Sequence, residues 1–272
     1  MMASHSEQAR FLHRDRGAAI LVGLAVVAAG LLFFGPRFTD PPSYFDFADQ
    51  RRILGIPNFM DVVSNVPWAV IGTLGLLCVY RERAGPGRPF TENWERLAWG
   101  VLFAGIGLVA FGSAYFHLSR DPARLVWDRL PITIVLMSFF ALMIGERVDM
   151  RTGRVLLVPL LAAGVSSALY WKYTESIGRG DARWYFLVQF FPVIAIPLMF
   201  RLFPPRYTQT PRLAFAMSLY ALAKVVEWLD RPIFATTRIV SGHTLKHLAG
   251  AGAALLLLQV VQFRRPSTAR RT

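Results

Sequence analysis

The chain has 272 residues, 54% of them hydrophobic, and its mean hydropathy is +0.40. Hydrophobic content this high, arranged in long runs, is typical of membrane proteins. A formal net charge of +13 would suggest nucleic acid in a soluble protein, but basic residues also gather in the cytoplasmic loops of membrane proteins. No nucleic-acid motif is present, so we expect no nucleic-acid partner. The single cysteine, Cys78, excludes a disulfide within the chain.

Eight apolar runs are long enough to span a bilayer, which takes about 20 mostly apolar residues. They cover residues 17–35, 62–80, 97–117, 126–145, 154–171, 185–203, 212–229 and 243–263. Short segments rich in glycine, proline and charge connect them, so we predict an all-α, polytopic membrane helical bundle. We interpret the first run as a retained helix, because it is long for a signal peptide and no small-residue cleavage site follows it.

Arginines and lysines are more frequent at those predicted helix ends that share a side with both termini. This bias predicts cytoplasmic N- and C-termini under the positive-inside rule. Only three of the 30 basic residues are lysines, which suggests a GC-rich coding sequence and a bacterial source. We therefore predict a multi-pass protein of a bacterial inner membrane.

Four ionisable residues gather at one depth of the predicted bundle. His117 ends the third helix, Asp128 opens the fourth, and His243 and His247 open the last. Since successive helices alternate in direction, these ends meet near the outer face. Ionisable groups in spanning helices are costly and by default mark a functional site.

The spacing of the histidines is typical of a metal site. His243 and His247 are four residues apart, so both rings project from one helix face. With His117 they form the three-histidine set of catalytic zinc sites, although other transition metals also accept this set. Thr244 stands where metalloproteases of the HExxH type have their glutamate, which makes Asp128 the candidate general base.

Ser113 lies one helical turn before His117 and on the same face. Its hydroxyl could donate a hydrogen bond to a substrate carbonyl or to the oxyanion formed from it. A nucleophilic role is disfavoured, because the nearest imidazole would be occupied by the metal. The plainer alternatives are a serine bonded to its own backbone, and an Asp128 that only favours a helix N-terminus or pairs with Arg129.

Two further acidic residues, Glu227 and Asp230, end the seventh predicted helix. We interpret them as partners that neutralise Arg231 or Lys246, since charges at this depth need a counter-charge.

Three segments, "GSAYFHL", "LVWDRLPITI" and "GHTLKH", together resemble the alkaline ceramidases. These belong to a group of seven-helix membrane hydrolases that also includes the adiponectin-receptor-like proteins. "NFMDVVSNVPW", residues 58–68, is similar to the start of their first core helix. The resemblance implies an N-terminal tail and extra transmembrane helix (1–43), a seven-helix ceramidase-like core (44–263) and a basic C-terminal tail (264–272).

The resemblance also implies an activity, the zinc-dependent hydrolysis of ceramide-like lipids to a fatty acid and a sphingoid base. The matching positions make His117, His243 and His247 the Zn²⁺ ligands, Asp128 the residue that acts on the attacking water, and Ser113 the contact to the carbonyl oxygen. Two alternatives stay open: a lipid esterase or acyl-remodelling hydrolase of the same group, and a non-catalytic lipid receptor that contains zinc.

Eukaryotic alkaline ceramidases carry in addition a Ca²⁺ site just before the first core helix. Asp46, Asp49 and Asn58 are the residues here that correspond to it. Arg51 and Arg52 stand nearby and the spacing is shorter, which counts against a cation that takes six to eight oxygen ligands.

Overall fold

The structure, a computed structural model, describes the backbone of residues 2–267 and the side chains of 14–41 and 44–267. In this part of the chain all named elements are helical, which confirms the predicted all-α bundle. Within the described residues, seven segments are helical, long and apolar enough to cross a membrane. The chain is therefore a multi-pass membrane protein.

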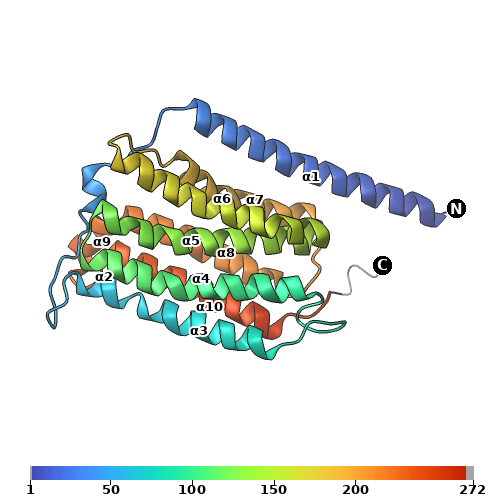
Figure 1. Cartoon of the computed structure of the whole chain (residues 1–272). Coiled ribbons are helices and arrows are strands. Elements are labelled where there is room, and N and C mark those ends of the chain that lie inside the picture. The colour runs from blue at the N-terminus through green and yellow to red at the C-terminus, as the bar shows by residue number, and fades with distance from the viewer. Residues whose placement is uncertain (1, 268–272) are drawn as a thin grey trace.

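The long helices lie side by side and alternate in direction (Figure 1). They are α1 (Met2–Phe34), α3 (Val66–Arg81), α4 (Asn93–Leu118), α5 (Pro122–Met143), α6 (Met150–Ser176), α7 (Arg183–Leu202), α8 (Thr210–Trp228) and α10 (Gly242–Phe263). Four short elements accompany them: η1 (Pro42–Phe45), α2 (Phe59–Val63), the π-helical η2 (Ile144–Val148) and α9 (Asp230–Thr237). Helix α1 contacts α7 at the edge of the bundle.

The predicted span 212–229 forms as α8 but is not among the seven segments of the described chain that are long and apolar enough to cross a membrane. It carries Arg212, Lys224 and Glu227 within 19 residues. Charge in a spanning helix is tolerated when it is paired or faces the interior of the bundle. The Lys224 ammonium meets the Glu227 carboxylate at 2.9 Å, and α8 packs along α10.

The predicted span 62–80 is interrupted near its start. Helix α2 ends before Ser64 and Asn65, and α3 then begins with Pro67 in its first turn. Proline lacks an amide hydrogen and disfavours helical geometry in the residue before it, so a continuous helix is not expected here. The break leaves Asp61, Ser64 and Asn65 buried at one end of the bundle.

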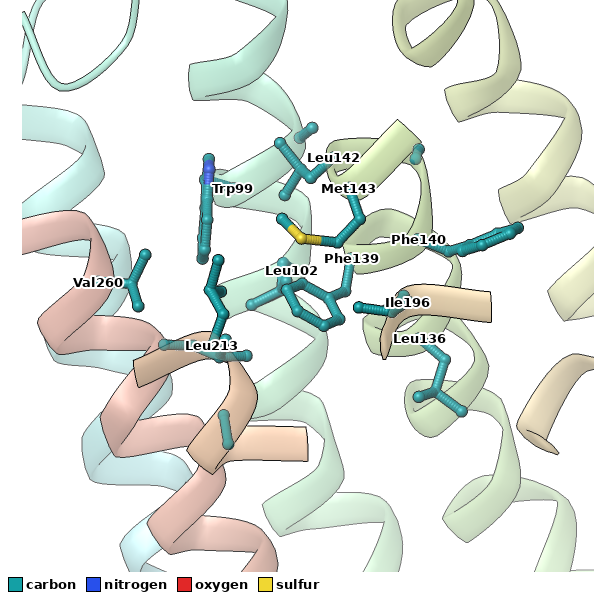
Figure 2. Close-up of a cluster of buried hydrophobic side chains, with 14 of the residues drawn as sticks. Trp99, Leu102, Leu136, Phe139, Phe140, Leu142, Met143, Ile196, Leu213 and Val260 are labelled. Carbon is teal, nitrogen blue, oxygen red and sulfur yellow. The ribbon is translucent and has the colours of Figure 1, made fainter. Parts of the chain in front are cut away.

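A core of large apolar side chains fills the opposite half of the bundle (Figure 2). It takes the first half of α4, the second half of α5, and residues of α7, α8 and α10. The side chains labelled in the figure are Trp99, Leu102, Leu136, Phe139, Phe140, Leu142, Met143, Ile196, Leu213 and Val260.

A polar cluster closes this half of the bundle. The buried Arg264 guanidinium lies 3.3 Å from Glu95 Oε1 and 2.7 Å from Glu146 Oε1, and 3.7 Å from the centre of the Tyr207 ring. We call these four residues the arginine cluster. The chain predicted as a basic tail thus begins with a residue inside the bundle, and residues 268–272 lie outside the described part.

Candidate metal centre

The three histidines of the predicted site come together in the structure. His117, His243 and His247 are buried, and one ring nitrogen of each lies within 4.8 Å of those of the other two. The Nε2 atoms of His117 and His243 are 3.1 Å apart, and the three ring centres are 4.7 to 5.0 Å apart. We call these residues the histidine cluster.

The donor atoms of the histidine cluster suit a tetrahedral metal. Ligands that stand about 2.0–2.1 Å from zinc at tetrahedral angles are about 3.3 Å from one another. The separation of the His117 and His243 nitrogens, 3.1 Å, is close to this value, and all three donor atoms lie within 4.8 Å of one another. Two facing imidazole nitrogens share a single proton, whereas one cation accepts a lone pair from each of three. The residues present therefore fit a zinc ion.

The first turn of α10 is held in place by polar contacts. The Ser241 side chain caps the helix, and Asp230 Oδ1 accepts a 2.7 Å hydrogen bond from the His243 amide. Amide groups in a first helical turn have no partner within the helix, so these contacts fix the turn that carries His243. Only glycine fits at 242, because a Cβ atom there would lie 2.0 Å from the Val226 carbonyl oxygen.

A second glycine brings α4 and α5 together beside the site. A Cβ atom on Gly112 would lie 2.0 Å from the Trp127 carbonyl oxygen, so the two backbones touch at this point. The residues that follow in each helix, Ser113 and Asp128, line one cavity.

The ring of His247 has a partner on its far side. Its Nδ1 atom lies 2.8 Å from Ser64 Oγ, and its carbonyl oxygen accepts a 3.0 Å hydrogen bond from the Trp68 indole. A metal on Nε2 leaves the ring proton on Nδ1, where it donates to Ser64. Partners of this kind orient metal-ligating histidines and raise their affinity for the metal.

Asp61 connects the two helices that carry the histidines. It is fully buried and accepts 2.8 Å hydrogen bonds from the Thr244 hydroxyl and from the Arg120 guanidinium. Thr244 lies in the first turn of α10, and Arg120 follows the end of α4. This carboxylate therefore fixes the separation of the two helix ends.

The roles of Asp61 and Ser64 were not predicted from the sequence. Both belong to the segment 58–68, which resembles the start of the first core helix of the ceramidases. The available signal was the group of polar residues just before Pro67, at the start of an otherwise apolar run.

A cavity of about 120 Å³ borders the histidine cluster at His247 and continues between α4, α5, α7, α8 and α10. Its polar lining includes His247, Ser113 and Asp128, and the rest is mostly apolar. Ser113 Oγ lies 3.5 Å from His247 Nε2, the nitrogen available to a metal. The Asp128 carboxylate is buried and has no hydrogen bond or ion pair to any described residue.

A larger cavity of about 680 Å³ adjoins the first one. The two share part of their walls, including Asp128, Gln189, Lys224 and Lys246. The larger cavity is the more polar, with Arg37, Asp40 and Arg129 among its lining residues.

Glu227 and Asp230 have different partners. Glu227 Oε1 meets the Lys246 ammonium at 2.9 Å, which agrees with the predicted neutralisation. Asp230 instead accepts hydrogen bonds from the backbone amides of His243 and Ala48, both 2.7 Å long. Both hydrogen bonds of the Asp230 carboxylate are therefore made to backbone amides, and the sequence pattern does not predict these partners.

Arg129, the alternative partner considered for Asp128, pairs with Asp40 at 2.8 Å. It also lies 4.0 Å from the centre of the Trp171 ring. The Asp128 carboxylate is thus not engaged by its neighbour in the sequence.

The three residues compared with a calcium site each bond a different partner. Asp46 pairs with Arg231, Asp49 pairs with Arg51 at 2.6 Å, and the Asn58 amide donates to the backbone at the end of α4. Burial raises the pKa of the Asp49 carboxyl, but the hydrogen bonds and charge of Arg51 outweigh this and lower that pKa from its usual value. An arginine thus occupies the place of a cation beside two of the three oxygen donors.

A scan of the sequence against models of known protein families finds no match, and a search of curated protein sequences finds no significant relative. The function is therefore inferred from the site itself. That site is a buried three-histidine cluster, able to hold a metal ion, at the end of an apolar cavity in a membrane-helical bundle.

Proposed function

We propose that the protein is an integral-membrane, zinc-dependent hydrolase that cleaves the amide bond of ceramide-like lipids to a fatty acid and a sphingoid base. One observation carries this proposal. His247, Ser113 and Asp128 line one cavity together with Lys224 and Lys246, and most of its other lining residues are apolar. Such walls suit a hydrocarbon chain, and the few polar groups suit a single functional group at its end.

The histidine cluster would hold the ion. Bound there, zinc supplies a Lewis acid that polarises the amide carbonyl and makes water nucleophilic at neutral pH. His247 and its contact to Ser64 keep one ligand nitrogen turned toward the cavity. The apolar walls keep bulk water away from the acyl chain.

Ser113 is placed to act on the carbonyl oxygen. Its hydroxyl lies 3.5 Å from His247 Nε2 and faces the same cavity. A hydroxyl in this position donates a hydrogen bond to the oxygen as negative charge develops on it.

Asp128 is placed to move the proton. Hydrolysis of an amide needs a base that takes a proton from the attacking water and an acid that returns one to the leaving nitrogen. A buried carboxylate that no arginine or lysine holds within ion-pair distance is free to do both. We further propose that both termini face the cytoplasm of a bacterium, which puts this chemistry near the outer face of the inner membrane.

The same groups could hydrolyse an ester. A metal site that catalyses no reaction would instead suit a lipid receptor. Turnover of N-lauroylsphingosine, compared with that of a lauroyl ester lipid, separates the amidase from the esterase. A protein that binds one zinc and turns over neither lipid would be a receptor.

Asp128→Asn tests the mechanism. We expect metal content to stay the same and turnover to fall by about 10²–10⁴-fold, the usual contribution of general acid–base catalysis. Asp121→Asn is the matched control, because Asp121 caps the same helix and asparagine caps equally well. Full turnover in Asp128→Asn would contradict the mechanism.

A further inference from the structure

Two lysines and one glutamate stand between the two cavities. Glu227 accepts one hydrogen bond from Lys224 and one from Lys246, each 2.9 Å long and each on a different carboxylate oxygen. Both lysines line both cavities. We call Lys224 and Lys246 the lysine pair.

The lysine pair carries more positive charge than Glu227 neutralises and more N–H donors than Glu227 accepts. Two ammonium groups share one carboxylate, so the three side chains together carry one positive charge. Each ammonium has three N–H donors and makes one hydrogen bond to a described side chain. The other carboxylate of the shared wall, Asp128, is near enough to act on the charge of Lys246 but forms no ion pair with either lysine in the described part of the chain. An ammonium at this depth whose remaining donors meet no anion is costly unless a ligand supplies one.

If the proposed function holds, the lysine pair lies beside the amine side of the bound lipid. The acyl chain then lies in the apolar cavity and the amide at its polar end, next to His247 and Ser113. The amine side of the lipid extends into the larger cavity, past Lys224 and Lys246. A neutral ceramide presents only hydroxyl groups there.

We propose that the substrate is an N-acyl lipid that carries an acidic group, a carboxylate or a phosphate, on the amine side of its amide, and that the lysine pair binds this group. Hydrogen bonds between an ammonium and an anionic oxygen are about twice as strong as neutral ones. The surplus charge of the lysine pair is thereby neutralised when substrate is present.

Two matched ligands test this inference without turnover. They are ketone analogues of N-lauroylglycine and N-lauroylethanolamine with a methylene group in place of the amide nitrogen, so that neither can be cleaved. They differ only in carrying a carboxylate or a hydroxyl group. Calorimetric titration of the purified, metal-loaded protein in a neutral detergent should give about tenfold or more tighter binding of the carboxylate, the size of one charge-assisted hydrogen bond.

Single substitutions assign the preference to the lysine pair. Lys246→Met should abolish it, and Lys246→Arg should retain it. Lys246→Met leaves Lys224 paired with Glu227 as a neutral couple, so the fold is expected to tolerate the change. Lys172→Met is the control, since Lys172 is the remaining lysine of the chain. Among the described residues its ammonium hydrogen-bonds only to the Pro122 carbonyl oxygen, at 3.4 Å. The two ligands can partition unequally into micelles, but this effect is the same for every variant. It cancels when the ratio of the two affinities is compared between wild type and variant.

Three results would overturn the inference. The first is equal affinity of the wild-type protein for the two ligands. The second is a preference that survives in both Lys246→Met and Lys224→Met. The third is laurate binding as tightly as the acidic analogue with the same dependence on the lysines, which would assign the lysine pair to the acyl product. Because these are binding measurements, they can succeed or fail independently of lipid hydrolysis.

Discussion

The two ends of the bundle both bury polar groups, but of opposite kinds. Helix α4 joins them, with Glu95 of the arginine cluster in its first turn and His117 of the histidine cluster in its last. At about 1.5 Å per residue the two lie about 33 Å apart, close to the thickness of the hydrocarbon core of a bilayer. The arginine cluster sets a cation against two carboxylates, whereas the histidine cluster sets three imidazole rings against one another.

The surroundings of the arginine cluster and the histidine cluster also differ. The Arg264 guanidinium is enclosed by the rings of Tyr207, Phe90 and Trp99, at 3.7 to 5.5 Å from their centres. The histidine cluster instead borders a cavity. A buried polar group whose partners are all protein groups stabilises the fold. A group of polar side chains that faces a cavity and lacks such partners indicates a ligand site. The arginine cluster therefore has the properties of a structural element, and the histidine cluster has those of a site that could hold a metal ion.

The largest effect is expected at the arginine cluster. Arg264→Ala leaves Glu95 and Glu146 buried without their cation, and removal of one partner from a buried ion pair costs about 3–5 kcal/mol. We expect this loss in the free energy of unfolding, measured in mixed micelles with increasing dodecyl sulfate. The zinc content of the folded fraction should stay unchanged.

Arg151→Ala is the control for this experiment. Arg151 is exposed at the same end of the bundle, in the first turn of α6, and its removal should change stability by less than about 0.5 kcal/mol. A loss of metal in Arg264→Ala at unchanged stability would contradict the separate roles given to the arginine cluster and the histidine cluster.

A smaller effect is expected from Ser64→Ala. The substitution removes the acceptor for the Nδ1 proton of His247, and loss of such a contact lowers metal affinity by about 10–100-fold. Competition with a zinc chelator of known affinity measures this change. Ser218→Ala, which removes an exposed hydroxyl bonded back to its own helix, is the control and should leave the affinity unchanged. Equal affinities in the two variants would mean that Ser64 does not support a metal ligand.

Much of this architecture can be predicted from the sequence, because lipid imposes simple demands. A spanning segment must be apolar and about 20 residues long, and successive spans must alternate in direction. Those two rules bring His117, His243 and His247 to one level although 126 residues separate the first two.

Residues whose role depends on a distant partner could not be predicted in this way. The carboxylate of Asp230 caps amides of His243 and Ala48, and Asp61 joins the ends of α4 and α10. Neither arrangement follows from periodicity, since each is decided by how helix ends pack. Arg264 was assigned to a basic tail because only tertiary structure reveals the two carboxylates that draw it into the bundle.

The central claim is that the histidine cluster holds one metal ion. The most direct test is the zinc content of the purified protein, with X-ray absorption to identify the ligands, compared between wild type and His117→Ala. We expect about one zinc per chain bound to three imidazole nitrogens in the wild type, and little or none in His117→Ala. Zinc that is absent from the wild type after zinc is supplied, or equally abundant in His117→Ala, would contradict the account.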